Sequence, residues 1–272
     1  MAAIVLLLSV WRPLPVNAGT VPMDAACVGF GAPGWPGEQG IPLCRKAFAA
    51  RFDTAAKVPL WTVEHLTKPQ VRSTGKGSKR DHFREDPALG KRSPTLADYR
   101  GADFDRGHMA PAEDADWDGA AYRETFLLSN VAPMVGRTMN RTLWADIEQV
   151  ARDWAYCRGE VYVWTGPVLK HPVASGRFIG PSRVAVPEQF YKIIYAPQGP
   201  QVIAFLAANQ KYQKPAVSSF VVAVDKIEAL TGLDFLSALP DAVEQRLEAS
   251  AAEATRRIHA YQGDGPYCGF AR

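Results

Sequence analysis

A small set of side chains in the middle of the sequence has the chemistry that phosphodiester hydrolysis requires. The segment Asp105-Arg106-Gly107-His108 is followed by Asn130, Asn140 and Glu148. Hydrolysis needs a group with a pKa near neutrality to deprotonate water, and a histidine supplies one. A guanidinium and a hard cation would stabilise the negative charge that develops on the phosphate. Because Mg²⁺ prefers oxygen ligands and keeps several waters, the side-chain oxygen of Asn140 can be its one protein ligand.

Each of these residues also has an ordinary structural explanation. A lone histidine after a glycine is common in loops, Asn140 is a good helix N-cap, and Glu148 could be a solvated helix charge. Arg106 could form a surface ion pair with Asp103 or Asp105. Only the joint pattern favours catalysis over these alternatives.

The spacing of apolar residues predicts a helix over residues 140–156 that carries two members of the set. The apolar stripe consists of Leu143, Ile147, Val150 and Trp154. Asn140 begins this helix and shares one face with Trp144 and Glu148, at i, i+4 and i+8. Glu148 lies about 12 Å further along the axis than Asn140. We therefore expect Glu148 to lean back and hold the metal's water shell rather than the metal itself.

The remaining pattern predicts an α+β fold with a central, largely antiparallel sheet flanked by helices, because strands and helices do not alternate regularly. Core strands are expected over 59–66, 160–165, 189–195 and 201–207. Residues 101–111 are rich in turn formers, and 125–130 look like a short buried strand or an extended stretch. A strand over 220–224 leads into a helix over 225–230 that Gly232 ends, and residues 241–261 are expected to be helical.

The first eighteen residues resemble a secretory signal peptide. Residues 2–11 form an apolar run of ten residues, and Val16-Asn17-Ala18 matches a cleavage site. The run is too short to cross a bilayer, which needs about 20 residues. No later apolar stretch is long enough either. We therefore expect cleavage after Ala18 and a secreted or periplasmic protein without a membrane partner.

Four cysteines, an even number, agree with export. The stretch between Cys27 and Cys44 is short and rich in Gly and Pro, so we favour a local disulfide there. Cys157 and Cys268 would then form the second bridge. Four buried free thiols are the alternative. Residues 19–57 are expected to be an irregular segment with this staple.

Basic residues gather between Lys68 and Arg92, although the formal charge of the whole chain is only +3. The stretch includes Lys79, Arg80 and Arg84, and it is interrupted by glycines. Such a loop suits contact with a phosphate backbone. A solvated surface loop explains it equally well.

At these residues the chain resembles the DNA/RNA non-specific endonuclease family, which includes mitochondrial endonuclease G and secreted bacterial nucleases. The resemblance rests on FDRGHMAP (104–111), FLLSNVAPM (126–134), the spacing of Asn140, Trp144 and Glu148, and VYVWTGPVL (161–169). Further matching segments include HFREDP (82–87) and VAVPEQFYK (184–192). The resemblance covers about residues 58–240, and we assign residues 58–272 to the endonuclease domain.

The resemblance implies a ββα-metal (His-Me finger) unit within the sheet and an enzyme that cleaves DNA and RNA with Mg²⁺, for which Mn²⁺ could substitute. It implies that His108 is the general base and that Asn140 is the metal ligand. Arg106 would contact phosphate, Glu148 would organise metal-bound water and Asn130 would support the site.

Two departures from the family pattern affect the assigned roles. A second active-site arginine has no unambiguous counterpart, and we favour Arg84 over Arg80, with Lys79 beside them as a phosphate contact. Met134 stands where the family often has Gln.

The resemblance leaves partners and biological role open. Related proteins are often dimers, so a homodimer is one expected assembly. An immunity or inhibitor protein is a further expected partner, because an exported toxin would carry the same chemistry. A binding protein without activity is the remaining alternative, which the intact His108 and Asn140 argue against.

Overall fold

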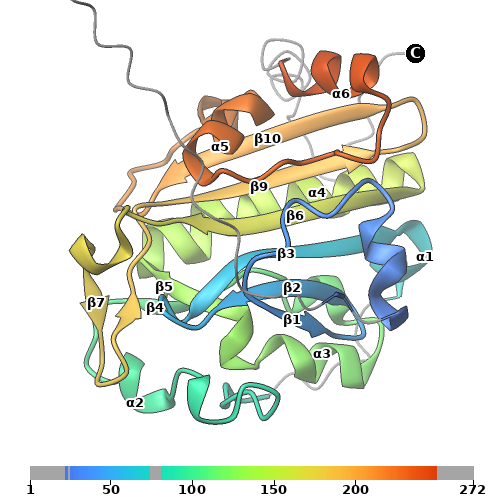
Figure 1. Ribbon diagram of the computed structural model, residues 1–272. Coiled ribbons are helices and arrows are strands. Elements are labelled where there is room, and N and C mark those ends of the chain that lie inside the picture. Colours follow the sequence, from blue (N-terminus) through green and yellow to red (C-terminus); the bar gives the residue numbers. More distant parts are fainter. Residues whose placement is uncertain (1–21, 24, 74–80, 250–272) are drawn as a thin grey trace, which may run out of the picture.

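A computed structural model gives the fold of residues 22–23, 25–73 and 81–249 (Figure 1). Its centre is a seven-stranded sheet in the order β1-β2-β3-β6-β9-β10-β11, in which neighbouring strands are antiparallel. The strands are β1 (Ile41–Cys44), β2 (Phe48–Asp53), β3 (Val58–Thr67), β6 (Glu160–Val168), β9 (Gln189–Ala196), β10 (Gln201–Ala208) and β11 (Val221–Val222). The predicted α+β class with a largely antiparallel sheet is confirmed.

Two further pairs of strands lie outside this sheet. β4 (Asp105–His108) pairs with β5 (Val131–Met134), and β7 (Phe178–Ile179) pairs with β8 (Val184–Ala185). The α-helices are α1 (Lys68–Arg72), α2 (Leu96–Tyr99), α3 (Gly119–Thr125), α4 (Ala145–Arg158), α5 (Val224–Thr231) and α6 (Asp241–Glu248). A π-helix, Gly136–Trp144, leads directly into α4. Short 3-10 helices are η1 (Ala25–Gly31), η2 (Gly90–Arg92), η3 (Glu113–Ala115), η4 (Leu128–Asn130), η6 (Val173–Ser175) and η7 (Val217–Phe220).

The sheet is buried on both faces, which divides the core into two layers. One face packs against α4, and its layer includes Leu143, Ile147 and Trp154. The other face packs against α5 and α6, through Ile227 and Leu247. Successive residues of β3 therefore enter different layers, as the two-residue period of a strand requires. The apolar stripe that predicted the long helix is the stripe that covers the sheet.

The strands predicted over 59–66, 160–165, 189–195 and 201–207 are all present, and each extends by up to three residues. The predicted strand and helix before Gly232 are also found. Gly232 adopts a left-handed conformation with φ of 69°, which favours glycine and ends α5. Of the helix predicted over 241–261, the part up to Glu248 is seen, and 250–261 lie outside the described residues.

The prediction that residues 19–57 are irregular is wrong for part of this range. β1 and β2 lie within it and form one side of the main sheet. The turn-forming residues that suggested an irregular segment precede β1, and the short strand β1 carries a proline. The sheet and the nuclease-like segments therefore share one folding unit that starts before residue 58.

Two local predictions in the centre of the chain also need correction. The segment 125–130 is not a strand, because α3 ends at Thr125 and a 3-10 turn, η4, follows. The predicted helix start at Asn140 is wrong as well. The π-helix begins at Gly136, and the Asn140 N–H donates to the carbonyl of Val135 over 3.0 Å, the i→i−5 pattern of a π-helix.

The predicted bridge between Cys27 and Cys44 is confirmed, with 5.7 Å between the Cα atoms. It links η1 to β1. Cys157 is also disulfide-bonded, and its predicted partner Cys268 lies outside the described residues. The free-thiol alternative is wrong for these described cysteines.

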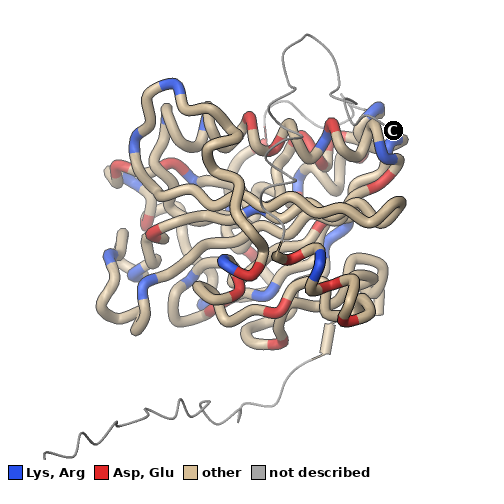
Figure 2. The backbone as a smooth tube through the Cα atoms, turned by 90° about the horizontal axis from the view of Figure 1, so that it is seen from above, with Lys and Arg blue, Asp and Glu red and all other residues tan. Residues whose placement is uncertain are grey.

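Basic and acidic residues are interspersed along the backbone rather than separated into two faces (Figure 2). Within the described ranges no helix is both long enough and apolar enough to span a bilayer. The predicted cleavage site at Ala18 lies outside these ranges.

Removal of the Cys27–Cys44 bridge should destabilise the fold without abolishing it. The bridge closes a loop with a sequence separation of 17 residues. Loop-closure entropy then predicts a loss of about 3 kcal/mol in the free energy of unfolding for the Cys27→Ala, Cys44→Ala variant. Urea unfolding at equilibrium measures it. Equal urea midpoints for the variant and the wild type would contradict this prediction, because they would show that the bridge does not stabilise the folded protein against the unfolded chain.

Candidate active site

β4, β5 and the helix that follows form a ββα unit at one edge of the molecule. His108 lies opposite Val131 and Arg106 opposite Pro133 in the antiparallel pairing. Because side chains alternate along a strand, Arg106 and His108 project from the same face of β4. The chain then turns into the π-helix that carries Asn140. This unit brings together residues that the sequence predicted for the site.

Gly107 lies between Arg106 and His108, and β5 leaves no room for a side chain at this position. A Cβ atom at this position would lie 2.7 Å from Cβ of Met134, a separation that side chains do not tolerate. Met134 is fully buried against the glycine. The methionine therefore fills space at the position where the family often has Gln.

The imidazole of His108 is enclosed by two aromatic rings. Its ring centroid is 5.0 Å from that of Phe83 and 5.2 Å from that of Phe126, which meets it edge-on. Phe83 and Phe126 also contact each other at 5.2 Å. This packing holds the imidazole in one orientation.

A short backbone bridge places both aromatic rings. Arg84 pairs with Leu127 in parallel, and each is the residue after one of the two phenylalanines. The Arg84 N–H donates to the carbonyl of Phe126 over 3.1 Å, and the Leu128 N–H donates to the carbonyl of Arg84 over 2.8 Å. Arg84 thus contributes to the site through its backbone.

The surroundings of His108 keep its imidazole neutral. Burial, and then the positive charge of Arg106, lower its pKa from 6.5 to about 4. Nε2 is buried and has no hydrogen-bond partner among the described residues. At neutral pH the ring is therefore in the form that can accept a proton.

The guanidinium of Arg106 packs on Phe83, one of the two aromatic rings that contact His108. Its Cζ lies 4.8 Å from the ring centroid of Phe83. Neither Asp103 nor Asp105 forms a salt bridge with Arg106 in the described structure, so the surface ion-pair alternative is wrong. The guanidinium stays beside the imidazole, where an anion could meet it.

Asp105 connects the strand to the helix. Its carboxylate accepts a hydrogen bond of 3.1 Å from Nδ2 of Asn140 and two of 2.8 Å from Arg141. Burial alone would raise the pKa of Asp105, but these hydrogen bonds hold it below its ordinary value. Gly136 allows the approach, since a Cβ there would lie 3.0 Å from Oδ1 of Asp105. The carboxylate therefore orients the amide of Asn140.

The donors of this site fit a hard divalent cation. The amide nitrogen of Asn140 is taken by Asp105, and Oδ1 accepts no hydrogen bond from any described residue. A free amide oxygen is a ligand that Mg²⁺ accepts, with water or phosphate oxygens completing its shell.

Glu148 extends from the first turn of α4 into a buried polar cluster above the sheet. Burial raises its pKa to about 8, while Lys192 lowers it and Asp114 raises it. Lys192 is fully buried and donates to Oγ1 of Thr165 over 2.6 Å. No hydrogen bond or ion pair joins Glu148 to Asn140 or His108 in the described part of the chain. Asn140 contacts Asp105 of β4, whereas the charges that act on Glu148 include Lys192 of β9.

Asn130 holds the backbone just beyond the histidine. Its Oδ1 accepts from the Ala110 N–H over 3.0 Å, and its Nδ2 donates to the carbonyls of Ala110 and Thr125 over 2.8 and 3.0 Å. Its own carbonyl accepts from the Met109 N–H. The side chain is fully buried, so it fixes the site from behind.

The predicted phosphate contacts are placed only in part. The guanidinium of Arg84 is half exposed, near Asp81, and donates to the carbonyl of Arg123 over 2.6 Å. Lys79 and Arg80 lie outside the described residues.

A family model described as DNA/RNA non-specific endonuclease matches residues 29–242. This chain belongs to that family. It is therefore a nuclease, an enzyme of a metal-dependent family whose activity is directed at DNA and RNA. The matched range begins before residue 58 and so includes β1 and β2.

Curated relatives and a solved structure agree with this assignment. This nuclease is 38% identical to Nuclease C1 of Cunninghamella echinulata var. echinulata over 80% of this chain and 90% of that protein. It is 32% identical to mitochondrial endonuclease G of Bos taurus over 82% and 80%. A solved structure of the EndoG/EndoGI complex, described as showing the mechanism of EndoG inhibition, gives a TM-score of 0.74 at 27% identity, over 81% of this chain and 95% of that chain.

The comparisons contradict the predicted secreted or periplasmic location. Relatives from Bos taurus, Homo sapiens, Saccharomyces cerevisiae and Schizosaccharomyces pombe are mitochondrial nucleases by name. The prediction used an apolar run and an even cysteine count. Neither feature identifies a compartment, because a short apolar run also occurs in other N-terminal segments and disulfides also serve as structural staples.

Sequence reasoning missed three residues of this site. Asp105 was considered only as an ion-pair partner, whereas it orients Asn140. Phe83 and Phe126 lie in segments that resemble the family, but nothing in the spacing of one sequence shows that they enclose His108. Their pairing depends on the bridge between Arg84 and Leu127.

Replacement of Asn130 by Ala should reduce stability strongly. It leaves two carbonyls and one N–H of the backbone without their partner, each at a cost of about 1–3 kcal/mol. We expect a loss of about 3 kcal/mol or more in the free energy of unfolding, measured by urea denaturation. A loss below about 1 kcal/mol would show that water replaces the amide.

The pKa of His108 should lie well below that of an exposed histidine. Histidine resonances followed by NMR, assigned with His108→Ala, should show the His108 signal titrating near pH 4, below the ordinary histidine value of about 6.5. Arg106→Gln removes a positive charge that disfavours the imidazolium, so it should raise the pKa of His108. A wild-type value near 6.5 would contradict the described burial.

Proposed function

We propose that this nuclease hydrolyses phosphodiester bonds of DNA and RNA with His108 as the general base and Mg²⁺ as the cofactor. The observation that carries the proposal is the neutral imidazole of His108, held between two rings on the strand that Asp105 connects to Asn140. Mn²⁺ is the expected substitute for Mg²⁺, because it accepts the same oxygen ligands.

His108 would take the proton from the attacking water. A neutral imidazole is ready for this step because one of its ring nitrogens carries no proton and can accept one. Phe83 and Phe126 restrict the motion of the ring and exclude water from its sides. A positioned base contributes about 10²–10⁴-fold to a reaction rate.

Arg106 would bind a non-bridging oxygen of the scissile phosphate. It projects from the same face of β4 as the base, so the anion it binds is brought next to the imidazole. Contact of its guanidinium with Phe83 fixes the position of the positive charge. Binding a phosphate here would also place negative charge near His108 and favour its protonation during the reaction.

Asn140 would hold the cation through its side-chain oxygen, with Asp105 fixing the amide from the other side. The cation, when bound, neutralises charge on the phosphate. We assign Glu148 to the water shell of the cation and Asn130 to support of the segment after His108.

Arg84, Arg80 and Lys79 would contact the nucleic-acid backbone beyond the scissile phosphate. The guanidinium of Arg84 is partly exposed on the side of the molecule where Phe83 borders His108. Such contacts carry no sequence information, which agrees with a non-specific nuclease. A protein inhibitor is a further proposed partner, since the similar solved structure is a complex of EndoG with EndoGI that is described as inhibition of EndoG.

Purified protein should digest supercoiled plasmid and RNA with Mg²⁺ and lose this activity in chelator. His108→Ala should reduce kcat at least about 100-fold because the base is absent. Asn140→Ala should raise the Mg²⁺ concentration that gives half-maximal activity. His171→Ala, at an exposed histidine, is the matched control and should cleave at the wild-type rate.

Three results would oppose this assignment. Cleavage by His108→Ala at the wild-type rate would show that His108 is not the base. Full activity in chelator would show that the enzyme needs no divalent cation. An unchanged Mg²⁺ requirement in Asn140→Ala would place the cation on other residues.

A further inference from the structure

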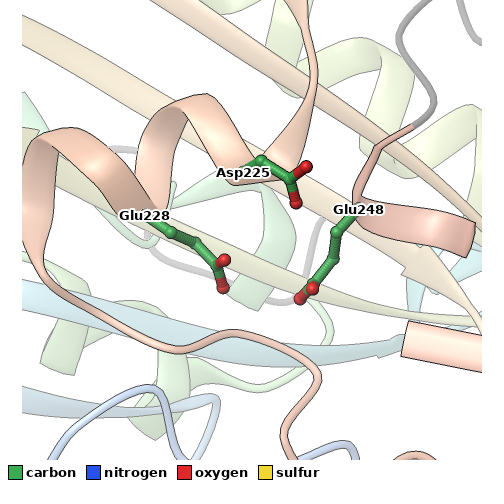
Figure 3. Close-up of side chains that lie close together, drawn as sticks. All are labelled: Asp225, Glu228 and Glu248. Carbon is green, nitrogen blue, oxygen red and sulfur yellow. The ribbon is translucent and has the colours of Figure 1, made fainter. Parts of the chain in front are cut away.

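α5 and α6 bring three carboxylates together on the face of the sheet away from α4. Asp225 and Glu228 are three residues apart on α5 and therefore lie on one side of that helix. Glu248 is the last residue of α6. One carboxylate oxygen of each residue lies within 4.8 Å of the other two. Figure 3 shows the three side chains directed toward a common space between the helices.

Glu248 is the one of these three carboxylates that is buried. Only 7% of the residue is exposed, and its Oε1 is buried without a hydrogen-bond partner in the described part of the chain. A buried carboxylate that lacks a partner is costly, because it gives up water and gains nothing in return. Its carboxylate points into the space that the other two carboxylates border (Figure 3).

The neighbouring charges increase this cost. Burial, and then the carboxylates of Glu228 and Glu244, raise the pKa of Glu248 to about 8. Burial raises the pKa of Glu228 too. Among the described residues no Lys or Arg forms a salt bridge with any of the three. Among the residues that the structure describes, no positive charge thus pairs with these carboxylates where they converge.

The cluster is already arranged to receive a ligand. Glu228 accepts the Phe235 N–H through Oε1 over 2.7 Å, which fixes its carboxylate and leaves the second oxygen available. Asp225 is exposed at the outer side of the cluster, so an ion can enter past it. Leu247, beside Glu248, is buried in the core layer below and holds the end of α6 in place.

We propose that Asp225, Glu228 and Glu248 bind a hard divalent cation, Ca²⁺ in preference to Mg²⁺. Carboxylate oxygens are ligands for both ions, but Ca²⁺ accepts irregular sets of six to eight oxygens, whereas Mg²⁺ demands a near-ideal octahedron. Two carboxylates from one helix and one from another form an irregular set that water would complete. The site is separate from the active site, because the main sheet lies between them.

Binding here would stabilise the fold rather than take part in hydrolysis. The ion would connect α5 to the end of α6, and α6 packs against β10 through Leu247. An ion that binds only the folded chain raises the free energy of unfolding with its concentration. At a hundred-fold excess over Kd this corresponds to a rise of about 5 °C or more in Tm.

The experiment uses the full chain with Asn140→Ala, which removes the proposed ligand of the active site. Ca²⁺ titration by calorimetry should give one site per chain, and Ca²⁺ should raise Tm. Adding Glu248→Gln or Asp225→Asn should weaken binding at least ten-fold and remove the Tm shift. Glu244→Gln is the matched control, since it removes the same charge from α6 without removing a ligand.

The outcomes separate this site from the proposed nuclease chemistry. No binding at millimolar Ca²⁺ in Asn140→Ala would overturn the proposal, as would equal affinities in Asp225→Asn and the control. If Glu248→Gln does not fold, Asp225→Asn decides, because this residue is exposed. Plasmid cleavage is not used as a readout, so failure of the catalytic assignment would leave this result unaffected.

Discussion

The carboxylate of Asp105 is the contact on which the geometry of the active site depends. It lies three residues before His108 on β4 and binds both Asn140 and Arg141 of the π-helix. Since the strand fixes His108 and the carboxylate fixes Asn140, one side chain sets the separation between the proposed base and the proposed cation ligand. Its bidentate partner, Arg141, keeps the carboxylate ionised and therefore able to accept the amide hydrogen.

The π-helix follows from the same constraint. A turn closed by an i→i−5 hydrogen bond contains more residues than an α-turn, so consecutive side chains diverge less around the axis. Asn140 and Arg141 can then reach one carboxylate, which consecutive residues of an α-helix would do less easily. Gly136 begins the turn where Asp105 approaches most closely. The π-helix thus accompanies the arrangement in which the adjacent residues Asn140 and Arg141 both bind the carboxylate of Asp105.

Much of the fold, and the residue types of the site, were accessible from sequence because they depend on local patterns. Strand alternation and the apolar stripe around Trp154 identify the sheet and α4. The strands β1 and β2 were missed because their sequence follows a run of turn formers, and because β1 pairs with β2, which joins the sheet by pairing with β3. The π-turn and the enclosure of His108 were missed for a similar reason. Each depends on a contact between distant segments, Asp105 with Asn140 and Arg84 with Leu127, that no spacing within one segment encodes.

The environments of His108 and Glu148 both disfavour the charged form of the side chain. A bound phosphate and a bound cation would together favour the charged forms. Burial keeps the imidazole of His108 neutral, and burial favours the protonated, neutral form of Glu148. A bound phosphate near Arg106 favours positive charge on the imidazole, whereas a cation near α4 favours negative charge on the glutamate. The protein alone therefore holds both groups neutral. Substrate and cation together would supply the field in which a proton arriving on His108 and an ionised Glu148 are both stable, so the charges needed for hydrolysis would form only in the complete complex.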